Sequence, residues 1–216
     1  MANGNRGKDR VEYDPISYDN IVRSVVSALL SQPIEPLTTK MTCAGSGIYA
    51  IYYVGVFGPY GPIASRPPRV PIYVGKAIPP GRRKGQRTEE PASLASRLGQ
   101  HARSLQLASN LQLEDFLCRA LPVREVWIPL SEQMLIQIFR PLWNCLVDGF
   151  GNHDPGSGRK SMIRPRWDTL HPGRPWASML EEKHRVEEII AEVREYLHRL
   201  DLKQPISQPC VDPKNS

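Results

Sequence analysis

The sequence predicts an α+β protein, because segments typical of strands alternate with longer segments of helical periodicity. The strand-like segments combine β-branched or aromatic residues with flanking glycine or proline. They are residues 47–54, 72–76 and 116–123. The longer segments repeat apolar residues three and four positions apart, as amphipathic helices do. With 216 residues, the chain is long enough for one sizeable domain with additions at its ends.

The first predicted helix covers residues 18–30. Its apolar side chains recur at helical spacing, and Ser17 or Asp19 is available to cap the first turn. Prolines and threonines follow and end the helix before the first strand. We expect this helix to pack beside the sheet, and residues 1–17 to form an arm ahead of it.

A segment rich in glycine and proline, residues 55–70, separates the first two strands and sets Tyr49 far from Tyr73 in sequence. We interpret it as an extended hairpin insertion, and an ordinary long turn is the alternative. A second polar insert over residues 78–91 follows the second strand. It leads into a helix predicted for residues 92–105, which repeats leucine at helical spacing.

Two further helices are predicted in the C-terminal half. Residues 131–139 place apolar side chains at helical spacing with Glu132 in the first turn, and Pro141 follows the helix. Residues 149–175 are dominated by glycine and proline, which favours a loop. A long amphipathic helix is predicted last, over residues 176–200. It would close the core or mediate dimerisation, and the sequence does not separate the two.

The composition favours a polyanionic partner such as nucleic acid, because the formal net charge is +6. Cysteines stand alone, without a CxxC pair, so neither a zinc site nor a disulfide framework is indicated. They are Cys43, Cys118, Cys145 and Cys210. The first ten residues are polar and unlike a secretory signal, and no apolar run is long enough to span a membrane. We therefore expect a cytoplasmic location.

Two tyrosine-bearing segments carry the main functional signal. They are Gly47-Ile48-Tyr49 and Tyr73-Val74-Gly75, and in chain order they are followed by Arg97, His101, Glu132 and Pro141-Leu142-Trp143-Asn144. This ordered set resembles the GIY-YIG nucleases over residues 43–147. The resemblance implies a small three-stranded, mainly antiparallel sheet flanked by helices, with helical additions at both ends. It also implies hydrolysis of phosphodiester bonds in double-stranded DNA.

The resemblance implies a role for Tyr49 in orienting or deprotonating the attacking water. A phenol with its ordinary pKa of about 10 is a poor base at neutral pH. We therefore expect a neighbouring cation such as Lys76, or the imidazole of His101, to perturb it. His101 lies four positions after Arg97, so both side chains project from the same face of the predicted helix. Tyr73 would contact the phosphate or brace Tyr49.

Arg97 suits the scissile phosphate, because a guanidinium makes charge-assisted, bidentate contacts. Glu132 would bind one Mg²⁺ per active site, with Mn²⁺ as a substitute, since such cations take carboxylate oxygens and otherwise keep water or phosphate ligands. Without the resemblance, Glu132 would be read as a favourable acidic residue near a helix N-terminus. Asn144 would hold the local backbone or Glu132.

Arginine and lysine side chains outside this set are predicted to contact DNA through phosphates or guanine edges. They are Arg66, Arg69, Arg82, Arg83, Lys84, Arg87, Arg159, Lys160, Arg164, Arg166 and Arg174. The segment that carries the last five, residues 149–174, is similar to GIY-YIG restriction enzymes that cut the palindrome CCGCGG. His153 and Asp154 in this segment also suggest a rival metal site, but no second ligand pair lies at helical spacing.

The sequence therefore predicts a type II restriction endonuclease that cuts a short GC-rich palindrome. Because one active site cuts one strand, we expect a twofold homodimer on DNA, and a cognate methyltransferase in the same system. A catalytically degenerate or structure-specific DNA-binding protein of the same fold is the alternative. We divide the chain into an arm and helix (1–42), a nuclease core with inserted loops (43–147) and a DNA-contacting loop region with a C-terminal helix (148–216), together forming one compact domain.

Overall fold

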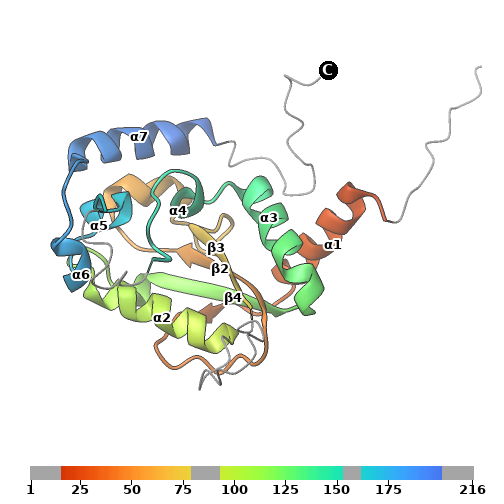
Figure 1. The fold of residues 1–216 in the computed structure, drawn as a ribbon. Helices are drawn as coiled ribbons and strands as arrows, with labels where there is room; N and C mark the ends of the chain where they lie inside the picture. Colours follow the sequence, from red (N-terminus) through yellow and green to blue (C-terminus); the bar gives the residue numbers. More distant parts are fainter. Residues whose placement is uncertain (1–15, 79–92, 153–161, 201–216) are drawn as a thin grey trace, which may run out of the picture.

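The computed structural model describes residues 16–78, 93–152 and 162–200. At its centre lies an antiparallel sheet with the strand order β1-β4-β2-β3 (Figure 1). Its strands are β1 (Glu35–Pro36), β2 (Gly47–Tyr53), β3 (Tyr73–Ala77) and β4 (Phe116–Pro122). The three predicted strands are confirmed, and the two-residue β1 adds a fourth at the edge of β4. The α+β class is therefore as predicted.

Strand β2 lies inside the sheet, between β4 and β3, and all seven of its residues are buried. Successive side chains of a strand point to opposite faces. Tyr49 and Ile51 accordingly belong to one hydrophobic cluster, whereas Ile48 and Tyr52 belong to another on the opposite face. The sheet is thus covered on both faces, which explains why the strand is apolar throughout instead of alternating.

Helices α1 and α3 cover the face of the sheet that carries Ile48 and Tyr52 (Figure 1). Helix α1 (Tyr18–Leu30) has the predicted bounds, and Ser17 caps it by accepting a hydrogen bond from the Asn20 amide. Its buried stripe packs against α3 (Ile128–Phe139), which follows the 3₁₀ helix η3 (Glu125–Trp127). Helix α3 starts earlier than predicted, so Glu132 lies in its second turn.

The opposite face of the sheet packs against α2 and the C-terminal elements. These are α2 (Leu94–Leu107), α4 (Leu142–Cys145), α5 (Arg166–Leu170), α6 (Pro175–Ser178) and α7 (Val186–Arg199). Helix α7 contributes Ile189, Val193 and Leu197 to the same cluster as Tyr49. Of its two predicted roles, this helix therefore fills the first and closes the core.

The insertion between β2 and β3 is folded against the core and is not an extended hairpin. It forms the 3₁₀ helix η1 (Gly58–Ile63), whose Tyr60 and Ile63 are buried beside α7. Tyr60 is an aromatic residue with a polar end, and burying it stabilises a segment whose glycines and prolines favour turns. A second short 3₁₀ helix, η2 (Leu113–Asp115), leads into β4.

The long helix predicted over residues 176–200 is interrupted, and the structure has α6 and α7 in its place. Arg164 explains the interruption. Its guanidinium donates hydrogen bonds to the carbonyls of Ala177 and Ser178, and its amide donates to that of Glu181. Carbonyls at the end of α6 are therefore satisfied by a side chain from another segment, which ends the helix there.

None of the described helices is long and apolar enough to cross a membrane. Among the described cysteines, Cys43, Cys118 and Cys145 carry free thiols.

Candidate active site

Tyr49 and Tyr73 lie on the same face of the sheet, on neighbouring strands. Tyr49 pairs across the strands with Gly75, and Ile51 pairs with Tyr73, so the two tyrosine rings are diagonal neighbours with centroids 6.3 Å apart. Gly75 is required at its position, since a Cβ there would lie 2.5 Å from the Tyr49 hydroxyl oxygen. The glycine of the second motif therefore makes room for the tyrosine of the first.

Helix α2 brings two further residues of the ordered set to this face. The His101 imidazole is 2% exposed, and its Nε2 lies 2.7 Å from the Tyr49 hydroxyl oxygen. Arg97 lies one turn earlier on α2 and is partly exposed, and its guanidinium donates a hydrogen bond of 2.9 Å to Gln100. Ser93 sets the start of α2 by accepting a hydrogen bond from the Ser96 amide.

Lys76 and Glu132 meet on the other side of β3. The Lys76 ammonium lies 2.6 Å from a carboxylate oxygen of Glu132, and both side chains are partly exposed. Lys76 pairs with Ile48 across the strands and so points toward the face covered by α3. Because β3 is an edge strand, groups from both faces of the sheet meet at this edge.

Asn144 holds the outer side of this edge strand. Its side-chain amide donates to the carbonyl of Val74 and its oxygen accepts from the Val74 amide, both at 2.8 Å. An unpaired strand edge is thereby covered by a side chain in place of another strand. Val74 lies between Tyr73 and Gly75, so Asn144 fixes the part of β3 that carries the site.

Burial sets the protonation of both tyrosines. Desolvation raises the pKa of Tyr49 far above its ordinary value, and Arg97 opposes this rise while Tyr73 and Glu132 add to it. The pKa of Tyr73 is raised for the same leading reason, again with Arg97 and Glu132 as neighbours. The expected lowering of the Tyr49 pKa by a cation is thus outweighed by burial, and both phenols are neutral at pH 7.

Among the residues that the structure describes, Glu132 is the carboxylate that meets Lys76 at this edge and is the candidate ligand for a divalent cation. Within residues 16–78, 93–152 and 162–200, no cluster of three His, Cys, Asp or Glu side chains gathers as a metal site would. One carboxylate, such as that of Glu132, is enough for Mg²⁺, because this ion takes one or two carboxylates and completes its shell with water and phosphate. One ion pair with Lys76 leaves other lone pairs of this carboxylate for a metal.

Apart from Arg174, the predicted DNA contacts fall into three groups. Arg66 and Arg69 are exposed on the segment before β3. Arg164 and Arg166 are partly exposed and pair with glutamates of the C-terminal segment, namely Glu182 and Glu192. Residues outside the described ranges are Arg82, Arg83, Lys84, Arg87, Arg159 and Lys160, together with the rival metal pair His153 and Asp154.

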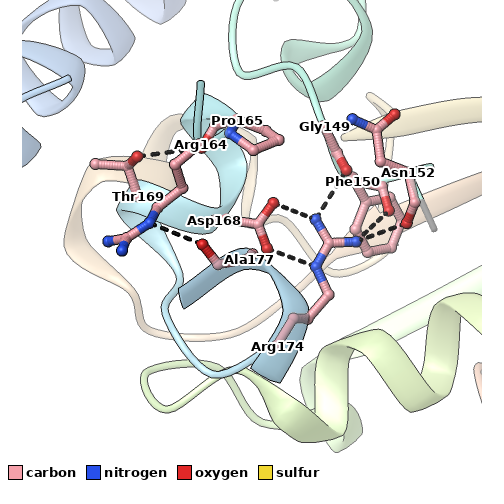
Figure 2. A network of polar contacts seen from close by, with 9 residues as sticks. All are labelled: Gly149, Phe150, Asn152, Arg164, Pro165, Asp168, Thr169, Arg174 and Ala177. Carbon is pink, nitrogen blue, oxygen red and sulfur yellow. Dashed lines mark hydrogen bonds and ion pairs between the residues drawn. The ribbon is translucent and has the colours of Figure 1, made fainter. Parts of the chain in front are cut away.

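Arg174 has a different environment from the one predicted for a DNA contact. It is 2% exposed and forms an ion pair with buried Asp168 (Figure 2). A side chain in this position cannot reach a phosphate without leaving its carboxylate partner buried and unpaired, which is costly. The sequence suggests DNA binding because formal charge does not distinguish a buried arginine from an exposed one.

Phe150 is the site neighbour that sequence reasoning missed. Its ring stacks on the His101 imidazole, with centroids 4.6 Å apart and an angle of 19° between the planes. It also meets the Tyr73 ring edge-to-face at 5.1 Å. The only signal in the sequence was an apolar residue between two glycines, Gly149 and Gly151, in a segment read as a loop.

The fold and the site now have a counterpart among known families. The Eco29kI GIY-YIG domain family matches residues 41–197, which cover the sheet, the candidate site and the C-terminal helices. A comparison with individual curated proteins finds no match. The family match covers most of the chain and includes the residues that the geometry brings together at the edge of β3. The protein therefore belongs to the Eco29kI family of GIY-YIG domains, which are restriction endonuclease domains.

Proposed function

We propose that the protein is a Mg²⁺-dependent type II restriction endonuclease that hydrolyses phosphodiester bonds at a short palindrome in double-stranded DNA. The observation that supports this most is the Tyr49–His101 contact beside Arg97, Lys76 and Glu132 at one edge of the sheet. Hydrolysis needs an activated water and stabilisation of charge on the phosphoryl oxygens. This edge of the sheet provides candidates for both.

The Tyr49 phenol acts as a proton relay in this proposal. A water that attacks phosphorus loses its proton to the Tyr49 hydroxyl oxygen, while the phenol passes its own proton to Nε2 of His101, 2.7 Å away. Tyr49 need not exist as a free phenolate, which its burial disfavours. His101 is then the final acceptor and holds the proton as an imidazolium.

Positive side chains stabilise the phosphate. Arg97 is partly exposed and close enough to Tyr49 to affect its pKa, so a phosphate held by its guanidinium lies near the relay. Lys76 is the second cation at this edge. Tyr49 itself is fully buried, so an approaching phosphate meets the partly exposed side chains of Tyr73, Arg97 and Lys76 first.

Glu132 would hold the metal in this proposal, sharing its carboxylate with Lys76. When bound there, Mg²⁺ supplies positive charge that stabilises the phosphoryl and leaving oxygens. Mn²⁺ is expected to substitute, since it takes the same oxygen ligands.

The recognition sequence and the dimer are also proposals. We infer CCGCGG as the site, from the similarity of residues 149–174 to restriction enzymes that cut it. One candidate site per chain supports a twofold dimer on a palindrome. Sedimentation of an inactive Glu132→Gln protein with a cognate duplex is expected to give two chains per duplex, and one chain per duplex would exclude the dimer.

Digestion of a plasmid that carries one CCGCGG site tests the function directly. With Mg²⁺ we expect a single linear product, no product when EDTA is added, and none from Glu132→Gln protein that still binds DNA. A matched plasmid with the site changed to CCATGG should stay intact. Binding without cutting by the unaltered protein would instead identify a catalytically degenerate DNA-binding member of the family.

A further inference from the structure

We propose that Arg174 is a positioning residue for the Tyr49–His101 pair and acts through the loop that carries Phe150. The inference rests on the proposed nuclease function and adds to it a residue that lies outside the candidate site. It also replaces the DNA contact predicted for this arginine.

All five N–H donors of Arg174 are used inside the protein (Figure 2). Nε and one Nη2 proton are donated to the two carboxylate oxygens of Asp168, at 2.6 and 2.5 Å. The guanidinium also lies near the rings of Trp167 and Trp176, with its central carbon 4.6 and 4.8 Å from their centroids. Asp168 and the aromatic rings therefore hold the plane of the guanidinium in one orientation.

The remaining donors hold the backbone of one loop. They reach the carbonyls of Gly149 at 2.8 Å, Phe150 at 3.2 Å and Asn152 at 3.0 Å. Gly149 adopts a φ of +105°, and a Cβ there would meet Pro165 at 2.2 Å, so the loop also needs glycine to follow this path. Arg174 thus holds the carbonyls of Gly149, Phe150 and Asn152, all in the loop that carries the Phe150 side chain.

Phe150 transmits this order to the candidate site. Its ring stacks on His101 at 4.6 Å, and the neighbouring Gly151 approaches Tyr73 so closely that a Cβ would lie 2.8 Å from the hydroxyl oxygen. The stack fixes the plane of the imidazole whose Nε2 faces Tyr49. Because proton transfer depends on heavy atoms within hydrogen-bond reach, a tilt of this ring weakens the relay.

The first test is Arg174→Lys, which keeps the charge but cannot make five hydrogen bonds in one plane. We expect kcat to fall about 10- to 100-fold, as displacement of a catalytic group does, with KM for DNA unchanged. The salt dependence of DNA binding should also stay unchanged, whereas loss of a phosphate contact would lower its slope by about 1. Loss of DNA affinity with a reduced slope and unchanged kcat would overturn the inference.

A spectroscopic measurement separates positioning from general loss of stability. NMR of the unaltered protein should show contacts between the ring protons of Phe150 and His101, and Arg174→Lys should lose them and shift the His101 ring nitrogens. The matched control is Arg119→Lys. Arg119 is a partly buried arginine that donates to Gln32 and Tyr52 and belongs to the opposite face of the sheet. This control should leave the His101 signals and kcat unchanged.

A second variant decides the matter if Arg174→Lys does not fold. Phe150→Leu keeps the Arg174–Asp168 pair and its carbonyl contacts but removes the stack on His101. It should lower kcat by a similar factor with KM unchanged, and unchanged kcat would overturn the inference. If the unaltered protein does not cut DNA, the proposed function fails, while the NMR comparison still tests whether Arg174 positions His101.

Discussion

Tyr49 and Tyr60 each direct a hydroxyl oxygen at the Nε2 of a buried histidine. The distance is 2.7 Å in the Tyr49–His101 pair and 2.5 Å in the Tyr60–His171 pair. Burial raises the pKa of both phenols far above the ordinary value. Neither the hydrogen bond nor the direction of the tyrosine pKa shift therefore distinguishes a candidate catalytic pair from a structural one.

The polar atoms of the Tyr60–His171 pair are occupied by hydrogen bonds to other side chains, which leaves none of them for a substrate. Trp143 donates its indole N–H to the Tyr60 oxygen at 3.0 Å, and the Nδ1 of His171 lies 2.8 Å from the Asn110 side-chain oxygen. Asn110 donates its amide to the carbonyl of Leu170, so its oxygen is the acceptor and His171 carries its proton on Nδ1. In this row of hydrogen bonds the polar side-chain atoms have neutral partners, which suits a network that stabilises the core.

The Tyr49–His101 pair instead lies among charges at a sheet edge. Arg97 lowers the pKa of Tyr49 and Glu132 raises it, against the larger rise caused by burial. Lys76 pairs with Glu132, and both of these side chains are partly exposed. The two pairs are linked by aromatic side chains. Phe150 stacks on His101 and also contacts Trp143, which donates a hydrogen bond to Tyr60. The difference between them teaches that charged, accessible neighbours mark the candidate catalytic pair.

The largest expected difference between the two pairs is in kcat, when the histidine of each pair is replaced in turn. His101→Ala should lower kcat by about 10²- to 10⁴-fold, because the proton acceptor is lost. His171→Ala should leave kcat per folded molecule within a few-fold but destabilise the protein by about 1–3 kcal/mol, because the buried Tyr60 hydroxyl loses its acceptor. Cleavage kinetics and urea unfolding measure the two effects. Equal loss of kcat in both variants would break the comparison.

A substitution at Gly75 tests the geometry of the first pair. Gly75→Ala places a methyl group against the Tyr49 hydroxyl and should displace it, with a fall in kcat of about 10- to 100-fold. Gly61→Ala, in η1 beside the second pair, is the matched control, because a Cβ there meets nothing within 4 Å. Cleavage by Gly75→Ala at the rate of the unaltered protein would show that Tyr49 does not need this position.

The smallest expected effect is a pH dependence of stability caused by the second pair. Burial lowers the pKa of His171 to about 3, below its ordinary value of 6.5. The unfolded chain therefore binds a proton below pH 6.5 that the folded protein excludes, so stability falls as the pH drops from 6.5 toward 3 and is fully present above 6.5. Between these pH values, His171 lowers the free energy of unfolding by about 1 kcal/mol for each unit by which the pH drops.

Urea unfolding at several pH values measures this contribution. His171→Gln should remove it, so that the variant loses less stability than the unaltered protein on going from pH 7 to pH 5. The exposed His198→Gln serves as the control and should unfold with the same pH dependence as the unaltered protein. A pH dependence unchanged by His171→Gln would show that this histidine titrates normally in the folded state.

Local patterns predicted most of the fold, because helical spacing and strand composition act over a few residues. Helix α1 has the predicted bounds, and the ends of β2, β3 and β4 differ from prediction by at most one residue. The break between α6 and α7 escaped prediction, since residues 181–185 contain no glycine or proline to signal it and the interruption depends on contacts of Arg164 from an earlier segment. Strand β1 was missed because two residues carry no pattern.

The ordered motif predicted which residues of the candidate site lie together, because its members are spaced along elements that the fold packs side by side. What it did not predict was their support. Phe150 and Arg174 lie on segments without periodicity, and their roles depend on contacts across the fold. The second tyrosine–histidine pair was also invisible, since Tyr60 and His171 are 111 positions apart in segments read as loops.

Parallel removal of the two tyrosine hydroxyls tests the central claim most directly. Tyr49→Phe and Tyr60→Phe each delete one oxygen atom from a buried tyrosine–histidine pair. Cleavage of a CCGCGG plasmid with Mg²⁺, DNA binding and urea unfolding are measured for both. We predict that Tyr49→Phe abolishes cleavage and still binds DNA, whereas Tyr60→Phe still cuts but unfolds at lower urea. Cleavage by Tyr49→Phe, or its loss in folded Tyr60→Phe, would contradict the account.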